Sequence, residues 1–325
     1  MSDVPIGVLV MAYGTASGPE DIERYYTDIR GGRPPAPEHL ADLKERYAAI
    51  GNRFPLLDIT TQQADGLVSA LNGSATDGSS FRAYLGMKHS PPFVADAVER
   101  MRADGIERAV GIVMAPHWSG MSTQTYVDRV REAAGNRSPS FTFVRSFHDH
   151  PMFVSFLAGR VAHALAKLMP AEREKATIVF SAHSLPVRTE DDASHRCKLC
   201  TAEVCATGCT YRAELERTAQ LVAAELDLHQ EVTTGWQSAG RTADPWWGPP
   251  LEDVIRQLAS AGHPAVVVCS AGFVSDHLEI LYDLDIEAQA LATEAGIRLV
   301  RTEMPNADPA FIQVLAAVVR EQLEA

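Results

Sequence analysis

Residues 177–209 read TIVFSAHSLPVRTEDDASHRCKLCTAEVCATGC, and they join a strand, a turn and a cysteine-rich loop. The apolar run Ile178–Phe180 is typical of a buried strand, and it leads to His183 at a turn that Pro186 closes. The four cysteines that follow have the spacing C-x2-C-x4-C-x3-C. A neutral imidazole binds metal ions, and four thiolates bind a metal ion or an iron–sulfur cluster. The stretch therefore indicates two kinds of metal chemistry close together in sequence.

Strand-like runs alternate with helical patterns on both sides of this stretch. Such alternation is typical of a parallel, doubly wound sheet. About four strands fall on either side of residue 150, so we predict an α/β fold of two similar Rossmann-like domains. Each would be a parallel four-stranded sheet flanked by helices, with the active-site cleft between them. The predicted strands are residues 6–11, 81–85, 109–114, 141–144, 177–181, 231–235, 265–269 and 297–300.

The predicted domain boundaries follow from this count. Residues 1–150 form the N-terminal domain, and residues 151–304 form the C-terminal domain, with His183, Glu279 and the cysteine insertion at 195–210. We expect the C-terminal segment 305–325 to join the N-terminal domain as a helix. Helices are also predicted over residues 38–50, 93–103, 155–168, 212–226, 251–261, 278–295 and 309–323.

Composition and charge exclude several classes of protein. The net charge of −13 argues against binding to nucleic acid or to an anionic membrane surface. No apolar run approaches the roughly 18 residues of a membrane span. The N-terminal apolar run has no basic residues before it, so it is predicted to be a first strand and not a signal peptide. We expect a cytoplasmic protein, in which cysteines rarely form structural disulfides; Cys269, in AVVVCSAG, is predicted to be a buried apolar residue.

Polar, aromatic and small residues follow five of the predicted strands, where open α/β sheets bind their ligands. His183 lies at one such exit, and Glu279 follows another. If the exits face each other, an imidazole and a carboxylate meet across a cleft, which suits Fe²⁺ binding and proton abstraction. Neither a G-x-G-x-x-G motif nor a P-loop follows the first strand, so both nucleotide fingerprints are missing from the sequence.

Three carboxylates, Glu279, Asp283 and Glu287, recur every fourth residue of a predicted helix and share one face. Two interpretations are open: a solvated acidic face, or a track that passes a hydrated cation or protons to Glu279.

In the N-terminal half, arginines and tyrosines are candidates for binding a large anionic aromatic ligand, because the arginine fork suits carboxylates. They are Tyr13, Arg30, Arg46, Tyr47 and Tyr126.

The four cysteines Cys197, Cys200, Cys205 and Cys209 predict a metal or cluster site, since few structural roles place four thiols in so short a loop. Zinc and [2Fe–2S] both accept four thiolates, and the spacing alone does not separate them. His195, just before the loop, is an alternative ligand.

Taken together, these segments resemble the ferrochelatase family over nearly the whole chain. The closest similarity is to the soluble ferrochelatases of Gram-positive type, which use coproporphyrin. The segments are LVMAYGT (9–15), DIERYYTDIRGGRPP (21–35), LKERYAAIG (43–51), MKHSPPF (87–93), APHWS (115–119), FSAHSLP (180–186), GWQSAGRTADPWWGP (235–249) and GFVSDHLEILYDLDIE (272–287).

The resemblance implies a role for each candidate residue. His183 and Glu279 match the iron-site histidine and glutamate, and Tyr13 matches a tyrosine that faces the metal from the opposite side of the macrocycle. Porphyrin-contacting positions are matched by Arg30, Arg46, Tyr47 and Tyr126, and an outer metal site by Asp283 and Glu287. Two positions depart from some relatives: Gly31 replaces a second arginine, and Phe54 replaces a serine.

The resemblance also implies the cofactor, since some family members carry a [2Fe–2S] cluster. The C-terminal tail has no cysteine, so a cluster here would use the internal four. This favours [2Fe–2S] over structural Zn²⁺, which remains the alternative.

The implied activity is that of a lyase that inserts Fe²⁺ into coproporphyrin III, forming coproheme in haem b biosynthesis. Protoporphyrin IX, giving protohaem, is the alternative substrate. The partners would be porphyrin and ferrous iron, with transient contact to haem-pathway enzymes. Two other interpretations are a chelatase for another tetrapyrrole, such as a cobalt chelatase, and a haem carrier or cluster-based sensor without turnover.

Overall fold

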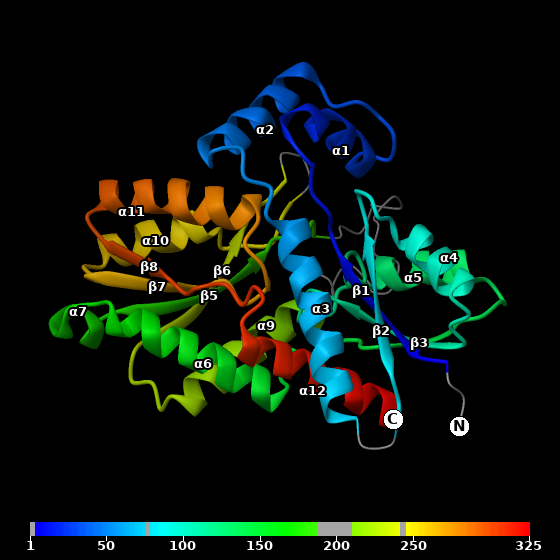
Figure 1. Cartoon of the computed structure of the whole chain (residues 1–325). Helices are drawn as coiled ribbons and strands as arrows, with labels where there is room; N and C mark the ends of the chain where they lie inside the picture. Colours follow the sequence, from blue (N-terminus) through cyan, green and yellow to red (C-terminus); the bar gives the residue numbers. More distant parts are fainter. Residues whose placement is uncertain (1–3, 76–77, 188–209, 241–244) are drawn as a thin grey trace.

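A computed structural model of the chain describes residues 4–75, 78–187, 210–240 and 245–325. Two parallel four-stranded sheets, each flanked by helices, make up the molecule (Figure 1). The first has the order β2-β1-β3-β4 and the second β6-β5-β7-β8, so both sheets repeat one topology. The predicted α/β class, with two parallel four-stranded sheets, is confirmed. The strands are β1 (Ile6–Ala12), β2 (Phe81–Met87), β3 (Arg108–Val113), β4 (Ser140–Phe143), β5 (Thr177–His183), β6 (Val232–Gln237), β7 (Ala265–Cys269) and β8 (Arg298–Arg301).

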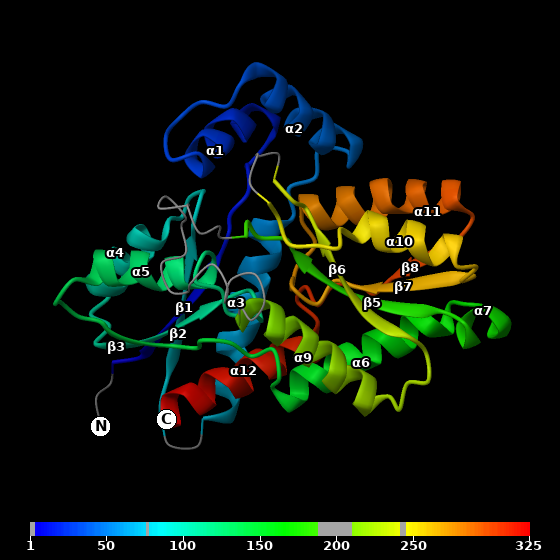
Figure 2. The same cartoon turned by 180° about the vertical axis from the view of Figure 1, so that it is seen from behind.

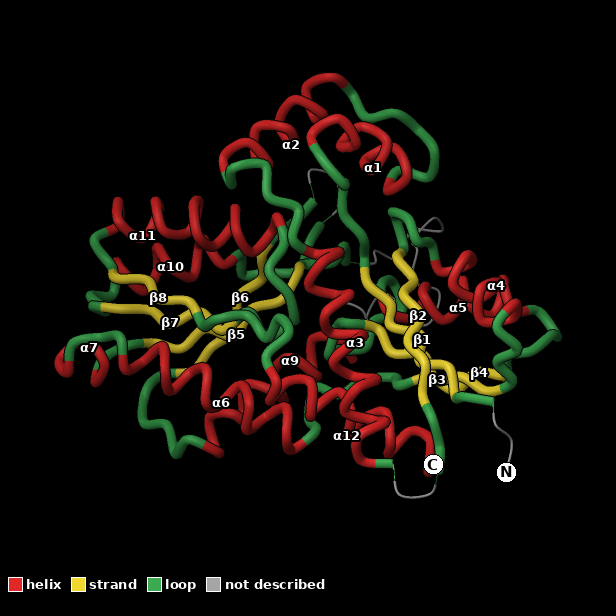
Figure 3. Tube along the Cα trace, viewed as in Figure 1, coloured by secondary structure: helices red, strands yellow, loops and turns green. Residues whose placement is uncertain are grey.

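The central strands β5 and β7 show why the sequence forms these sheets. Nearly every side chain of β5, and every side chain of β7, is buried, because helices cover both faces of the second sheet. Such strands are continuous apolar runs and lack the alternation of a half-exposed strand. In Figure 3 the strands form two separate groups, each between helices.

The helices lie between the strands in sequence. They are η1 (Pro19–Asp21), α1 (Ile22–Ile29), α2 (Pro37–Ala49), α3 (Leu56–Ser74), α4 (Val94–Ala103), α5 (Thr123–Ala134), α6 (Pro151–Ala166), α7 (Pro170–Glu174), α9 (Thr210–Glu225), α10 (Leu251–Ser260), η2 (Ile280–Ala288), α11 (Gln289–Ala295) and α12 (Pro309–Glu324). The helix predicted over residues 278–295 is divided: η2 is a π-helix, and α11 continues it. Its buried apolar residues fit either helix type, so their spacing did not reveal the π-turns, which are frequent at functional sites.

Helices α1 and α2 lie above the region between the two sheets in both views (Figures 1 and 2). Tyr47 and Ile50 at the end of α2 belong to the same apolar cluster as Leu281 of η2. A segment from the N-terminal half is therefore packed against the acidic helix of the C-terminal half.

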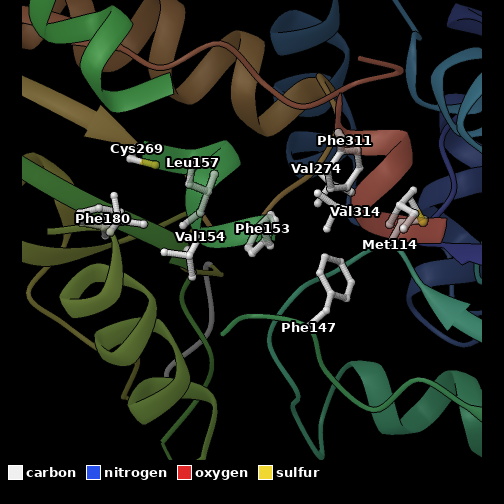
Figure 4. Packing of buried hydrophobic residues seen from close by; sticks show 14 of the residues in the cluster. Met114, Phe147, Phe153, Val154, Leu157, Phe180, Cys269, Val274, Phe311 and Val314 are labelled. Carbon is white, nitrogen blue, oxygen red and sulfur yellow. The ribbon is translucent and has the colours of Figure 1, made fainter. Parts of the chain in front are cut away.

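The C-terminal helix α12 packs on α3 and α6 and also reaches β3 and β4. Its Phe311 lies 6.3 Å from Phe153 of α6 between ring centroids, and Phe153 contacts Phe147 edge-on at 5.3 Å (Figure 4). One apolar core thus joins residues of both sheets, and the boundaries 1–150 and 151–304 stay a prediction.

Cys269 confirms the expectation of a buried apolar residue. Its side chain is fully buried in the core (Figure 4), and burial raises the pKa of its thiol to about 12. Within the described part of the chain, no helix has the length and apolar character needed to cross a membrane.

Candidate active site

The two sheets reverse their strand order between β1 and β3 and between β5 and β7. Ligands of open α/β sheets bind at such switch points, beyond the carboxyl ends of the strands. His183 ends β5, and Glu279 lies ten residues beyond Cys269, the last residue of β7. The structure brings their side chains together: His183 Nε2 lies 3.7 Å from Glu279 Oε1. Both side chains are about one-third exposed, at 31% and 35%.

A close backbone contact holds the loop after β7 against β5. A Cβ atom at Gly272 would lie 2.5 Å from the Cβ of Ala182, so only glycine fits beside the residue that precedes His183. The Gly272 amide donates to the carbonyl oxygen of Ser181 at 3.1 Å. From the other side, Gln63 of α3 donates to the carbonyl oxygens of Val274 and Asn306, at 3.0 and 2.9 Å. Both halves of the chain therefore fix the loop that leads to Glu279.

The ring of His183 is oriented by its own backbone. Nδ1 bonds to the carbonyl oxygen of Ser184, which places a proton on Nδ1 and, in the neutral ring, leaves the lone pair on Nε2. Tyr211, in the first turn of α9, donates its hydroxyl to the His183 carbonyl oxygen at 3.2 Å. Tyr211 itself is buried, with its ring 5.7 Å from that of Trp247. The atom of His183 that faces Glu279 is thus the one able to accept a proton or bind a cation.

His277 is a further member of this group that the sequence analysis did not single out. Its Nε2 lies 3.3 Å from Glu279 Oε2, so Glu279 sits between two imidazoles. Partial burial alone would raise the pKa of Glu279, but His183, His277 and Arg46 outweigh it and lower the pKa to about 2. Burial alone would lower the pKa of His277. The hydrogen bond to Glu279 and the negative charge of Glu279 outweigh burial and raise that pKa. Its position two residues before Glu279, within the SDHLE motif, was the available signal.

Asp283 lies one turn beyond Glu279 in η2, with a side chain only 6% exposed. Ser238 donates its hydroxyl to Oδ2, and Arg46 Nη1 lies 3.7 Å from Oδ1. Burial, and then the charge of Glu279, raise the pKa of Asp283 to about 7, although Ser238 and Arg46 oppose this. Asp283 therefore exchanges a proton near neutral pH, and a cation that reaches it competes with that proton. The exposed Glu287 lines the same cavity of about 250 Å³ as Asp283 and Arg46.

Of the N-terminal candidates, Tyr13 is open to solvent and Tyr126 is not. Tyr13 follows β1 and is 41% exposed, whereas Tyr126 is 3% exposed in the core beneath it. Lys88 links the two, with Nζ 5.9 Å from the ring centre of Tyr13 and 5.1 Å from that of Tyr126. Burial, and then the nearby Tyr13, raise the pKa of Tyr126 well above its ordinary range. Tyr13 is therefore accessible to solvent, and the buried Tyr126 is joined to it through Lys88.

Tyr47 and Arg46 occupy different surroundings although they are neighbours in α2. Tyr47 is buried, stacks on Phe54 at 4.5 Å, and its hydroxyl lies 3.3 Å from Thr15 Oγ1. Burial raises the pKa of Tyr47 to about 12. Arg46 instead lies 3.2 Å from Asp42 and over the Tyr282 ring, facing the acidic helix. Phe54, one of the two departures noted above, is thus the stacking partner of Tyr47.

Arg30 lies exposed where α1 ends, and Gly31 follows it with φ of 65°. Nothing lies within 4 Å of a Cβ atom built at Gly31. The chain is therefore open to solvent at the end of α1.

The family of this chain is decided by comparison with known proteins. The family model described as "Ferrochelatase" matches residues 5–323. The chain belongs to the ferrochelatase family. Its relatives include the coproporphyrin III ferrochelatase of Anoxybacillus flavithermus, 47% identical over 99% of this chain and 98% of the relative. The coproporphyrin III ferrochelatase of Bacillus subtilis is 45% identical over 99% of each chain.

Solved structures support the ferrochelatase fold at low sequence identity. SirB from Bacillus subtilis with Fe³⁺ has a TM-score of 0.54 at 12% identity and covers 98% of this chain and 96% of its own. CbiX, the terminal enzyme for siroheme biosynthesis in denitrifying bacteria, has a TM-score of 0.52 at 12% identity, with 97% of this chain and 98% of its own covered. These likenesses concern the two-sheet fold alone.

Among residues 4–75, 78–187, 210–240 and 245–325, no group of three or more His, Cys, Asp or Glu side chains is arranged to hold a metal ion. Asp283 and Glu287 lie along η2, and Glu279 is the residue just before it. The four cysteines, Cys197, Cys200, Cys205 and Cys209, lie outside the described residues, so the cluster stays a prediction.

Proposed function

We propose that this chain is a ferrochelatase that inserts Fe²⁺ into coproporphyrin III and releases coproheme for haem b biosynthesis. The observation that carries the proposal is the His183–Glu279 pair, 3.7 Å apart at a switch point, in a chain of the ferrochelatase family. The named relatives at 45% and 47% identity are coproporphyrin III ferrochelatases, which favours that porphyrin over protoporphyrin IX.

The reaction exchanges two pyrrole protons for one Fe²⁺ ion. His183 accepts the two pyrrole protons one after the other at Nε2 and releases each to solvent, and the ionised Glu279 stabilises the imidazolium that forms each time. His277 takes part by sharing the other oxygen of Glu279. Tyr13 faces the metal from the opposite side of the macrocycle. Because the porphyrin plane cannot open by itself, binding energy from its propionates is used to distort the ring.

The remaining candidate residues have binding roles in this proposal. Arg30, at the open end of α1, binds a propionate, and Arg46, Tyr47 and Tyr126 shape the porphyrin site around it. Asp283 and Glu287 form an outer site through which Fe²⁺ approaches Glu279. Their spread along η2 supports a passing ion more than a resident one. We also propose a cytoplasmic location, with transient contact to other enzymes of the haem pathway.

Initial rates with coproporphyrin III and protoporphyrin IX, measured side by side with anaerobic Fe²⁺, test the substrate. We expect kcat/KM to be at least about tenfold higher for coproporphyrin III, equivalent to about 1.4 kcal/mol of transition-state binding. A preference for protoporphyrin IX would reverse the substrate assignment. Tight haem binding without turnover of either porphyrin would indicate a carrier or sensor instead.

The second proposal concerns the four cysteines. We propose that Cys197, Cys200, Cys205 and Cys209 hold a [2Fe–2S] cluster, with structural Zn²⁺ as the alternative. The donor set fits, since both groups accept four thiolates. The cluster is structural or sensing, because inserting Fe²⁺ into a porphyrin transfers no electron. The last of these cysteines directly precedes α9, whose Tyr211 bonds to the His183 backbone.

The visible absorption spectrum of the purified protein, with iron, sulfide and zinc analysis, tests the cluster. We expect a coloured protein with two iron and two sulfide ions per chain. Cys200→Ser should lose the colour, whereas Cys269→Ala, which alters a buried core cysteine, should keep it. A colourless protein with one zinc per chain contradicts the cluster and supports the alternative.

A further inference from the structure

The cavity beside Asp283 has a third carboxylate that comes from a different helix. The cavity is about 250 Å³ in volume, and Glu252 of α10 lines it together with Asp283 and Glu287 of η2. Arg46 of α2 and Ser238 after β6 complete its polar lining. Glu252 precedes the acidic helix by about thirty residues, so no pattern in the sequence connects it with that helix.

Several buried polar atoms of residues that line this cavity lack hydrogen-bond partners in the described part of the chain. Asp283 is buried, and its Oδ1 accepts no hydrogen bond, although Arg46 lies 3.7 Å away. The indole Nε1 atoms of Trp236 and Trp247, two other residues of the lining, are also buried without partners. Buried polar groups of native proteins are normally satisfied by protein or by ordered water. At about 30 Å³ per water, the cavity has room for about eight waters, enough for an ion that keeps its hydration shell.

The charge of Glu252 is not used by a structural ion pair. Among the residues that the structure describes, no lysine, arginine or histidine lies within ion-pair distance of its carboxylate. The next residue, Asp253, differs from Glu252 in its exposure, its ion pairing and its position relative to the cavity. It is exposed, pairs with Arg256 at 2.8 Å, and is not part of the cavity lining. Glu252 is half-buried, so solvent screens its charge less than that of a fully exposed group.

We propose that Glu252 is a third carboxylate of the cation-uptake cavity and that it draws hydrated Fe²⁺ toward Asp283 and Glu279. This inference rests on the proposed function, because it concerns the metal substrate of that reaction. The cavity lining has three carboxyl groups and one arginine, so it stays negative even when Asp283 is protonated. Carboxylate oxygens bind divalent cations that retain their waters, and a negative cavity raises the local cation concentration.

The test varies Fe²⁺ under anaerobic conditions at saturating coproporphyrin III, with the full-length protein. We expect Glu252→Gln to raise the KM for Fe²⁺ by about three- to tenfold, as the loss of one screened attractive charge would. The kcat and the KM for coproporphyrin III should stay within about twofold. Asp253→Asn removes the same charge one residue away and should leave all three constants unchanged. Thermal unfolding of both variants should match that of the wild type, which separates a binding role from a structural one.

An unchanged KM for Fe²⁺ in Glu252→Gln would overturn the inference. An equal rise in Asp253→Asn would also overturn it, since the effect would then be one of net charge. If the wild type fails to insert Fe²⁺ into coproporphyrin III, the proposed function fails separately. Equilibrium dialysis of Fe²⁺ without porphyrin then tests whether Glu252 helps the cavity to bind Fe²⁺. Weaker binding by Glu252→Gln than by Asp253→Asn supports the inference, and equal binding contradicts it.

Discussion

Replacing His183 with alanine should lower Fe²⁺ insertion by about 10³-fold or more while coproporphyrin III still binds. The imidazole supplies the lone pair that faces Glu279, and general base catalysis is typically worth about 10² to 10⁴ in rate. A histidine that also guides the metal should lie toward the upper part of that range. The porphyrin should bind within about threefold of wild type, because the residues proposed to hold its propionates belong to the N-terminal half.

Single-turnover insertion of Fe²⁺ and a fluorescence titration with coproporphyrin III measure the two quantities separately. His163→Ala is a matched control, because this histidine of α6 is 60% exposed and lies 3.8 Å from Glu303, outside the candidate site. That variant should keep wild-type rates. Full insertion activity in His183→Ala would refute the assignment of the active site.

Glu279→Gln should lower kcat for insertion by about 10²-fold, with the KM for coproporphyrin III little changed. The substitution keeps the shape of the side chain and removes the charge between His183 and His277. Since Glu279 helps to raise the pKa of His277, the variant should return that pKa toward or below its ordinary value. His183 would then lose the carboxylate proposed to stabilise its imidazolium.

The pH dependence of this loss follows from the pKa of Glu279. Because that pKa is lowered to about 2, the carboxylate is ionised throughout pH 6 to 8, and its removal should lower the rate at every pH in that range. Rate profiles of wild type and variant test this, with Glu294→Gln as a control at an exposed position of α11. A variant that keeps more than half of the wild-type kcat, or whose loss vanishes at one end of the range, would contradict the role given to Glu279.

The candidate site shows where sequence patterns succeed and where they fail. His183 and Glu279 were found because each follows an apolar run that could only be a buried strand, and strand exits are where such sheets bind ligands. Tyr126 and Tyr47 matched motif positions, but nothing in their local sequence shows that both are almost fully buried. His277 and Glu252 were missed because only their neighbours in space indicate a role. His277 contacts Glu279, and Glu252 lines the cavity beside η2.

The sequence by itself determined the parallel α/β architecture and the family, because buried central strands such as β5 and β7 are continuous apolar runs within single segments. It also determined which strand exits carry chemistry. Only the tertiary structure decided which side chains lie together in the site. Contacts between Gly272 and Ala182, and between Gln63 and the loop after β7, hold them there. Such contacts join segments far apart in the chain and depend on close packing, so they leave no local periodicity in the sequence.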